Sequence, residues 1–296
     1  MSGGARNDDP GQDGTDAGTA KRSAEAAAAE EQRALTALQA DPGPVGPAWS
    51  YGPGPDQIAE LFGPDDGPLV VVVHGGYFRP GTDRTHARPQ ARALAAEGYR
   101  VVLAEYRRVP GSPDDTVEDL RALDAALAAV PGTALPGTAG HVTSGHGTSG
   151  HGTAAAWVGH SAGGALVLLR ALTADLAPVP VLALAPVADL AVADRDHLGS
   201  DAVPDWIGGS PAEYPDRYAR LDPQALLKSG SEPGASVTVL HGNRDTLVPV
   251  ALTTDLPASP RLHARILEGA HHLDLIDPDS PHWPAVLAEL HRLTDP

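Results

Sequence analysis

The clearest candidate for chemistry is Ser161, which lies in the pentapeptide Gly-His-Ser-Ala-Gly at residues 159–163. The apolar run AAAWV comes directly before this pentapeptide, and the helical run ALVLLRALTA follows it. A strand, a sharp turn and a helix in this order hold a serine in a strained backbone conformation and expose its hydroxyl for nucleophilic attack. The flanking Gly159 and Gly163 let the strand and the helix approach each other closely.

A serine hydroxyl is a weak nucleophile, so it needs an imidazole base and a carboxylate that orients this base. Asp245 follows the apolar run VTVLHG, and the adjacent His271 and His272 follow the run ARILEG. Loops at the carboxyl ends of parallel strands meet at one edge of a doubly wound sheet, so these side chains can reach the serine. The alternative for Asp245 is a plain turn residue. The chain order Ser, Asp, His is that of α/β-hydrolases, and either histidine can serve as the base.

An acyl-transfer site also needs N–H groups that stabilise a developing oxyanion. His74, Gly75, Gly76 and Tyr77 directly follow the apolar run LVVVV, the position at which hydrolase folds carry such a loop. We expect donors from the N–H groups of Gly76, Tyr77 and Ala162, with His74 and Gly75 as supporting residues. The alternative, a plain Gly-Gly turn, does not explain why this loop follows a buried strand.

These loops require a parallel sheet. Short apolar runs alternate with amphipathic stretches such as ARPQARALAAEG and DLRALDAALAAV, which predicts an α/β fold with a doubly wound, mostly parallel sheet. The expected strands are residues 69–73, 101–105, 155–159, 179–185, 237–241 and 264–267. Residues 188–228 leave this alternation and are rich in Pro and Gly, which indicates a short cap.

Composition excludes several classes of function. The 296 residues carry a formal charge of −17, which argues against nucleic acid or an anionic membrane as a partner. The absence of cysteine excludes disulfides, a thiol nucleophile and thiolate metal sites. The N-terminal residues do not have the pattern of a secretory signal, and no apolar run in the sequence approaches membrane-spanning length. We therefore expect a cytoplasmic protein.

The chain divides into three parts. We expect a disordered acidic tail over residues 1–22, a marginal helix and linker over 23–48, and a hydrolase domain over 49–296. A low-complexity loop at 131–153 interrupts the domain, with histidines at positions 141, 146 and 151. Their five-residue spacing does not suit a single metal ion, so no metal site is expected.

Several motifs together resemble the kynurenine formamidase-like (arylformamidase) branch of the α/β-hydrolases, and HGG-type carboxylesterases share most of them. The motifs are SYGPGPDQIAELFGP, HGGYF, GYRVVLAEYRRVP, GHSAGG, WIGGSPAEYPDRYARLDPQALL, HGNRDTLVP and HHLDLIDP, from Ser50 to the C-terminal region. The resemblance favours His272 as the base, because LDLIDP matches the segment after the catalytic histidine in related hydrolases. Phe78, where the family often has Trp, and the run YRRVP at 106–110 depart from the family pattern.

The resemblance implies a serine hydrolase without a cofactor that cleaves N-formylkynurenine in tryptophan breakdown, or small carboxylic esters. The substrate-lining candidates are Phe78, His160 and Trp206. A general short-chain carboxylesterase outside tryptophan catabolism is the first alternative, and a hydrolase-fold binding module without turnover is the second. The expected partner is a small ester or formamide, while both a monomer and a homodimer are compatible with the sequence.

Overall fold

The computed structural model describes residues 13–131 and 154–295. Its centre is one eight-stranded sheet in the order β1-β2-β4-β3-β5-β6-β7-β8. The first two strands run antiparallel to their neighbours, and the others are parallel, which confirms the predicted fold class. The strands are β1 Ala48–Ser50, β2 Ile58–Phe62, β3 Leu69–Val73, β4 Arg100–Ala104, β5 Ala156–His160, β6 Val181–Leu184, β7 Val237–Gly242 and β8 Leu262–Leu267.

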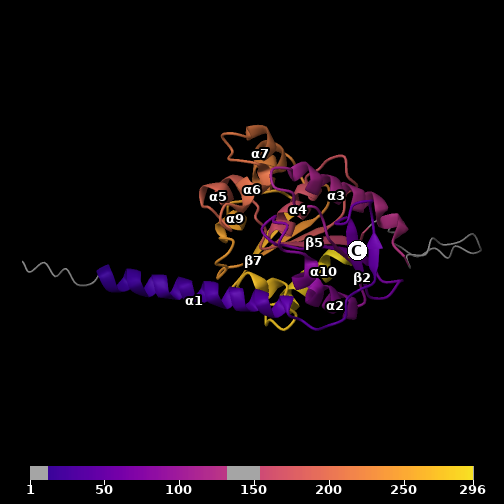
Figure 1. Cartoon of the computed structure of the whole chain (residues 1–296), viewed down its shortest axis with the longest axis horizontal. Coiled ribbons are helices and arrows are strands. Elements are labelled where there is room, and N and C mark those ends of the chain that lie inside the picture. Colours follow the sequence, from indigo (N-terminus) through magenta and orange to yellow (C-terminus); the bar gives the residue numbers. More distant parts are fainter. Residues whose placement is uncertain (1–12, 132–153, 296) are drawn as a thin grey trace, which may run out of the picture.

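Helices cover both faces of this sheet (Figure 1). Alternate residues of β3 show the two layers, because Val70 and Val72 pack with α2 and α10, whereas Val71 and Val73 pack with α3 and α4. Continuous apolar runs such as LVVVV are therefore buried on both sides. The covering helices are α2 Arg88–Ala96 and α10 Trp283–Thr294 on one face, and α3 Pro113–Ala126 and α4 Ala162–Ala171 on the other.

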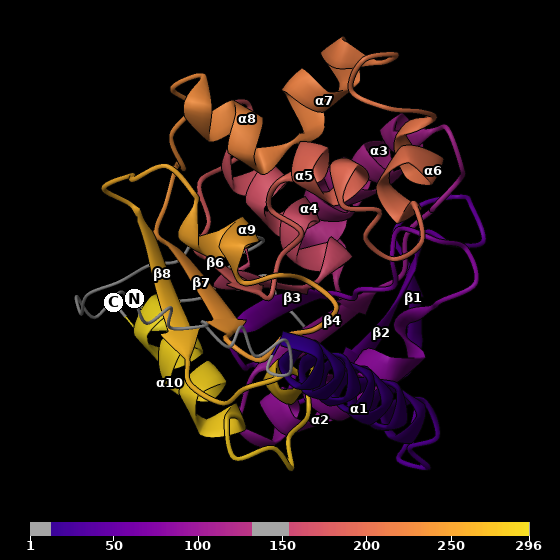
Figure 2. The ribbon, with the colours of Figure 1, turned by 90° about the vertical axis from the view of Figure 1, so that its left-hand side faces the viewer.

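Between β6 and β7 the chain forms the expected cap. Figure 2 shows its helices above the sheet, on the side opposite to α1, α2 and α10. The cap helices are α5 Leu190–Arg195, α6 Ala202–Ile207, α7 Pro215–Leu221 and α8 Pro223–Lys228. Shorter elements lie at the loops: η1 Arg84–Ala87, η2 Leu127–Ala129, α9 Ala251–Thr254 and η3 Leu273–Leu275.

All six predicted strands are present, with ends within two residues of the expected ones. The sequence interpretation did not foresee β1 and β2. The first is only three residues long and half-exposed, and the second carries the charged Glu60 on a buried position, so neither has the apolar pattern of the parallel strands.

The N-terminal helix α1 spans Asp13–Gln39 and is longer than expected. This corrects the predicted boundary of the tail at residue 22. Alanine, lysine and arginine residues favour helix, and extending an anchored helix costs less than starting one. Residues 1–12 of the predicted tail and residues 132–153 of the predicted His/Gly loop lie outside the described residues.

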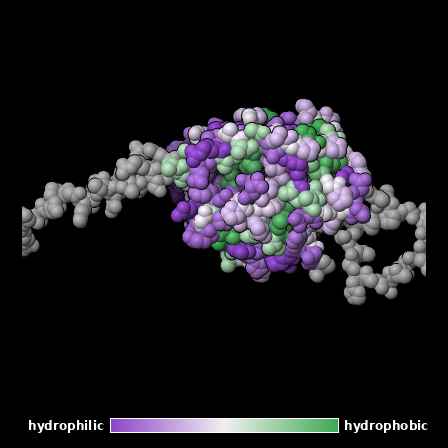
Figure 3. All heavy atoms as spheres, turned by 90° about the horizontal axis from the view of Figure 1, so that it is seen from below, coloured by the Kyte–Doolittle hydropathy of each residue, from purple (hydrophilic) through white to green (hydrophobic). Residues whose placement is uncertain are grey.

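The surface seen from below mixes hydrophilic residues with small, separate hydrophobic patches (Figure 3). Within the described parts of the chain, no helix combines the length and apolar character needed to cross a bilayer.

Candidate active site

Ser161 occupies a sharp turn between β5 and α4. Its backbone has φ 57° and ψ −119°, a conformation that L-residues rarely adopt and that costs on the order of 1–3 kcal/mol. The flanking glycines make the turn possible. A Cβ at Gly159 would lie 2.2 Å from the Gly163 carbonyl oxygen, and a Cβ at Gly163 would lie 2.2 Å from the Val73 carbonyl oxygen. The pentapeptide therefore forms the predicted strand, turn and helix.

Asp245 and His272 meet beside this turn. The Nδ1–H of His272 donates to Oδ2 of Asp245 over 2.6 Å, and the Asp245 side chain is fully buried. The other carboxylate oxygen accepts from the backbone N–H groups of Leu247 and Val248 at 2.9 and 2.7 Å. With both oxygens occupied, the carboxylate is held in one orientation and fixes the imidazole so that Nε2 is free to accept a proton.

The electrostatics of this pair favour an ionised aspartate. Burial raises the pKa of Asp245, but the charge of His272 and hydrogen bonds from His241 and His272 outweigh burial and hold this pKa well below its ordinary value. Burial lowers the pKa of His272, whereas Asp245 and the more distant Glu31 raise it, with a net upward shift. The protonated form of His272 is thus stabilised by two carboxylates.

The neighbouring His271 is oriented differently. Its backbone N–H donates to Oδ2 of Asp274 over 2.7 Å, and its ring nitrogen Nδ1 lies 3.8 Å from Oε1 of Glu31. The structure thus brings His272, rather than His271, into contact with Asp245.

His160 supports the His272 loop from β5. Its Nε2–H donates to the backbone carbonyl oxygen of His272 over 3.0 Å, and the two ring centroids lie 4.4 Å apart. Burial, followed by the nearby charges of His272 and His86, lowers the pKa of His160 well below its ordinary value. His160 is therefore a neutral donor that fixes the loop.

The loop after β3 has the backbone of an anion-binding turn. Gly76, Tyr77 and Phe78 all have positive φ, at 124°, 57° and 53°. Among the described residues, none accepts a hydrogen bond from the N–H of Gly76 or Tyr77. Ala162 is the first residue of α4, where N–H groups have no acceptor inside the helix. These three N–H groups are free of acceptors among the described residues, and their assignment as an oxyanion hole stays a prediction.

A buried ionic network supports this loop. His74 Nε2 lies 3.1 Å from Oε1 of Glu105, and the backbone N–H of Arg84 donates to the other carboxylate oxygen over 3.1 Å. Arg108 also donates to Glu105, while Arg84 Nε lies 2.9 Å from Glu60. Burial raises the pKa of Glu105, but His74 and Arg108 lower it by more. The net result is a pKa well below the ordinary value of a glutamate. Arg108, part of the unusual run YRRVP, thus holds the base of the loop.

A cavity of about 30 Å³ opens at Ser161. Five of its lining residues were not predicted from the sequence: Leu35, Thr82, His86, Leu247 and Leu273. The full lining is Leu35, Gly76, Tyr77, Thr82, His86, His160, Ser161, Leu247, His272 and Leu273. Burial lowers the pKa of His86 to about 4, so this imidazole is neutral at pH 7. No local motif marks His86, because it enters the site only through the fold of the segment before α2.

Two of the three predicted substrate-lining residues do not line this cavity. Phe78 and Trp206 stack on each other, with ring centroids 4.3 Å apart and planes at 12°. Both are buried, and the Trp206 indole N–H donates to the Thr116 hydroxyl over 3.1 Å. The apolar core thus takes up these aromatic rings and anchors the cap to the body, and only His160 lies where we expected it.

Residues 70–290, most of the chain, match the family described as the alpha/beta hydrolase family. The chain belongs to the alpha/beta hydrolase family. The protein is accordingly a hydrolase, and the predicted superfamily is confirmed. No curated protein matches the sequence.

Solved structures of esterases share the fold of this hydrolase at low sequence identity. Esterase B from Lactobacillus rhamnosis is 18% identical over 95% of this chain and 96% of that chain, with a TM-score of 0.65. The hyperthermophilic esterase of Pyrobaculum calidifontis is 20% identical over 93% of this chain and 92% of that chain, with a TM-score of 0.56. At such identities the likeness shows the fold.

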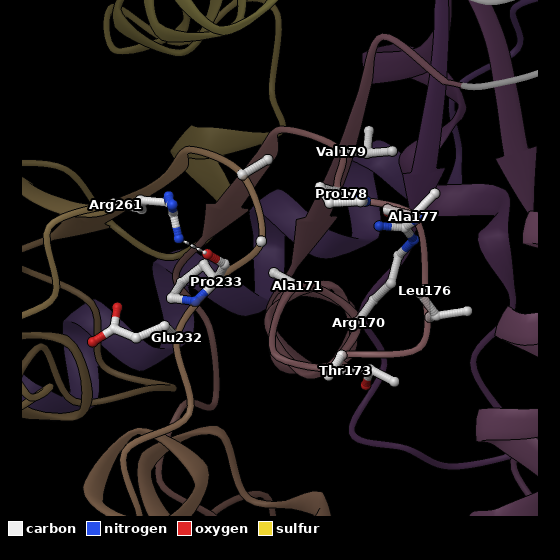
Figure 4. A pocket seen from close by; sticks show the side chains of 13 residues that line it. Arg170, Ala171, Thr173, Leu176, Ala177, Pro178, Val179, Glu232, Pro233 and Arg261 are labelled. Carbon is white, nitrogen blue, oxygen red and sulfur yellow. Dashed lines mark hydrogen bonds between the residues drawn. The ribbon is translucent and has the colours of Figure 1, made fainter.

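A larger hollow of about 220 Å³ lies elsewhere on the hydrolase (Figure 4). Two of its lining residues lie just before strands: Val179 is two residues before β6, and Arg261 directly precedes β8. This hollow is therefore at the amino edge of the sheet, away from Ser161. Its charged groups are occupied, because Arg170 pairs with Asp124 and Arg261 donates to a backbone carbonyl. It holds no nucleophile paired with a base.

Proposed function

We propose that this hydrolase cleaves small carboxylic esters through a Ser161–His272–Asp245 triad. The observation that carries the proposal is the 2.6 Å hydrogen bond between His272 Nδ1 and Asp245 Oδ2 beside a cavity that Ser161 also lines. A buried aspartate that orients an imidazole next to a strained serine is the arrangement that activates a hydroxyl for acyl transfer.

In the first half of the reaction, Ser161 Oγ attacks the carbonyl carbon of the ester and its proton passes to His272 Nε2. The tetrahedral intermediate collapses when His272 returns this proton to the leaving alcohol oxygen, and the acyl group stays on Ser161. Water, deprotonated by His272, then attacks the acyl-enzyme and releases the carboxylic acid. The N–H groups of Gly76, Tyr77 and Ala162 stabilise the oxyanion in both halves, and each such donor is worth about 10²–10³ in rate.

The size of the cavity supports a short acyl group. A volume of about 30 Å³ exceeds what a single water molecule needs and suits a short acyl group. Leu35 and Tyr77 line this cavity, whereas Phe78 does not. We therefore assign the limit on acyl length to Leu35 and Tyr77.

The test is steady-state hydrolysis of p-nitrophenyl esters with acyl chains of two to eight carbons. We expect the acetyl ester to react fastest, and Ser161→Ala to lower its rate by at least about 10⁴. Leu35→Ala enlarges the cavity and should move the preference toward longer chains. Faster cleavage of the octanoyl ester than of the acetyl ester by the wild-type protein would refute the short-acyl assignment.

A fluorophosphonate probe tests the nucleophile separately. Wild-type protein should be labelled and Ser161→Ala should not. Absence of labelling together with absence of ester hydrolysis would favour a hydrolase-fold binding module. Esterase B, which has the same fold, has been studied with a tributyrin phosphonate inhibitor.

A formamide is the second candidate substrate, because a formyl group is the smallest acyl group and suits so small a cavity. N-formyl-L-kynurenine should then be cleaved by formyl transfer to Ser161, release of the aryl amine and hydrolysis to formate. Efficient, Ser161-dependent deformylation well above the ester rates would support an arylformamidase in tryptophan catabolism. Ester cleavage without deformylation would leave a general short-chain carboxylesterase.

A further inference from the structure

Glu31 is a buried carboxylate on the N-terminal helix α1. The residue is only 2% exposed, although residues 28–30 and 32–33 on either side of it are exposed. Its Oε1 accepts from the backbone N–H of Thr246 at 2.9 Å and from that of His272 at 3.4 Å. One N–H belongs to the residue after Asp245, and the other belongs to the proposed base itself. A single side chain thus bridges the two loops that carry Asp245 and His272.

Packing alone does not explain a glutamate at this position. Glu31, Ala34, Leu35 and Leu38 form the inward stripe of α1, at the i, i+3, i+4 and i+7 spacing of an amphipathic helix, and the other three are apolar and pack on the core. Burial of a carboxylate is costly unless it is paired. Among the described residues, no Lys or Arg nitrogen lies within 4 Å of this carboxylate, and the side-chain nitrogen that pairs with it is Nδ1 of His271 at 3.8 Å.

We propose that Glu31 is a positioning residue, whose carboxylate holds the Asp245 and His272 loops together and makes helix α1 part of the active site. The proposal rests on the proposed Ser161–His272–Asp245 triad. Thr246 and His272 keep their backbone positions through Glu31, so the imidazole of His272 stays beside the cavity that Ser161 also lines. Glu31 itself does not contact the reacting atoms.

The charge of Glu31 acts on the same imidazole. His272 is surrounded by ionisable groups from several elements: Asp245 and His241 from β7 and the loop after it, His160 from β5, Tyr77 from the loop after β3, His271 beside it and Glu31 from α1. Burial lowers the pKa of His272, while Asp245 and then Glu31 raise it. Loss of the Glu31 charge should therefore lower this pKa.

Three variants separate position from charge. Glu31→Gln keeps a carbonyl acceptor for the two N–H groups but removes the charge, and Glu31→Ala removes both. Glu30→Gln is the matched control, since Glu30 is the exposed neighbour on the same helix. The thermal unfolding temperature of each variant is measured first. All kinetics are done at least 15 °C below the lowest value, several times the shift of about 2–4 °C that 1 kcal/mol produces in a domain of 150–250 residues.

The kinetic readout is kcat and KM for p-nitrophenyl acetate between pH 4.5 and 9. The base form of His272 is active, so activity rises as its proton leaves. In Glu31→Gln and Glu31→Ala this acidic limb should move to lower pH, because the imidazolium has lost a nearby negative charge. Glu31→Ala should also lower kcat at the plateau by about tenfold with little change in KM, because the base is less well aligned. Glu30→Gln should match the wild type.

The second readout does not depend on turnover. NMR titration of the histidine ring protons, with the His272 signal assigned through His272→Gln, reports the pKa of His272 directly. We expect this pKa to fall in both Glu31 variants and to stay unchanged in Glu30→Gln. An unchanged His272 titration in folded Glu31→Gln and Glu31→Ala would overturn the proposal.

The two proposals fail in different ways. A wild-type protein that neither cleaves esters nor reacts with a fluorophosphonate refutes the proposed function, and the NMR titration still decides whether Glu31 controls His272. A wild-type protein that cleaves esters through Ser161, with the same pH profile and kcat in both Glu31 variants, refutes the role of Glu31 and leaves the triad in place.

Discussion

The cap helices and helix α1 lie on opposite sides of the molecule (Figure 2), and each contacts loops of the candidate site through different chemistry. The cap holds the loop after β3 through apolar contact: Trp206 stacks on Phe78, and Gly199 packs against the Tyr77 ring. Helix α1 holds the other two loops through the buried carboxylate of Glu31. Both segments therefore hold loops of the candidate site in place, the cap through aromatic packing and α1 through a carboxylate.

Because the contacts differ, we expect variants in the cap and variants on the α1 side to change different measurable quantities. Buried aromatic rings contribute area and packing, so changes in the cap should act mainly on the free energy of unfolding. A carboxylate beside an imidazole changes a pKa, so changes on the α1 side should act mainly on the rate and its pH dependence. Variants on the two sides of the site can therefore be told apart by which quantity they change.

The largest effect is expected on the α1 side of the site, at Asp245. Asp245→Asn keeps the shape of the side chain but removes its charge and favours the wrong tautomer of His272. We expect kcat/KM for p-nitrophenyl acetate to fall by about 10⁴ with a folded protein. The measurement is steady-state kinetics together with circular dichroism.

The matched control makes the same change in the cap. Asp205 is exposed and pairs with Arg79 at 3.0 Å, so Asp205→Asn should change kcat/KM by less than about twofold. Comparable losses in the two variants would contradict the division between the cap and the catalytic side.

The second effect is the destabilisation of the cap by Trp206→Ala. This indole is only 2% exposed, and its removal leaves a cavity against Phe78. We expect the free energy of unfolding in urea to fall by about 3–5 kcal/mol. At low temperature the folded fraction should keep kcat/KM within about tenfold of the wild type, since the ring does not line the Ser161 cavity. A loss of several hundredfold without destabilisation would return Trp206 to the substrate site.

Local sequence patterns identify some parts of the candidate site, whereas contacts between distant segments are invisible to them. Ser161, Asp245 and the loop from His74 to Tyr77 were predictable, because each follows a buried strand at the sheet edge where such loops meet. Continuous β-branched runs such as LVVVV indicate the apolar strands. The turn at Ser161 is equally local, since glycine spacing alone permits it.

Long-range contacts were not predictable. Glu31 is 214 positions from Asp245 in the sequence, and a glutamate in an alanine-rich helix has the appearance of a solvated residue. The one available signal was its place on the stripe with Leu35 and Leu38, which marks an inward position. For Trp206 the sequence suggested a contact that the cavity does not show. An aromatic ring in a cap indicated substrate contact, but the indole stacks on the buried ring of Phe78.

A third effect concerns the pH dependence of cap stability. Burial and the charge of Asp189 raise the pKa of Asp222 to about 6 from its ordinary 3.8, although backbone N–H groups of the cap oppose the shift. The folded protein therefore holds this proton more tightly than the unfolded chain. The resulting stabilisation is complete below pH 3.8 and is lost as the pH rises through 6.

The measurement is the free energy of unfolding of Asp222→Asn minus that of the wild type, from urea titrations at several pH values. This difference should increase by about 2 kcal/mol between pH 4 and pH 8, because only the wild type then holds a buried ionised carboxylate. Other titrating groups cancel in the difference. A constant difference over this range would show that Asp222 has an ordinary pKa.

The smallest effect is expected at the Tyr218 hydroxyl, and it is the most direct test of the cap. Tyr218 is 4% exposed and donates to the Gly209 carbonyl oxygen over 3.1 Å, which ties α7 to the turn after α6. Tyr218→Phe should lower the free energy of unfolding by about 1 kcal/mol and leave kcat/KM unchanged. A phenol that served the reaction would give the reverse, a tenfold or greater loss of kcat/KM with unchanged stability. That result would place a residue of the cap, Tyr218, in the reaction itself.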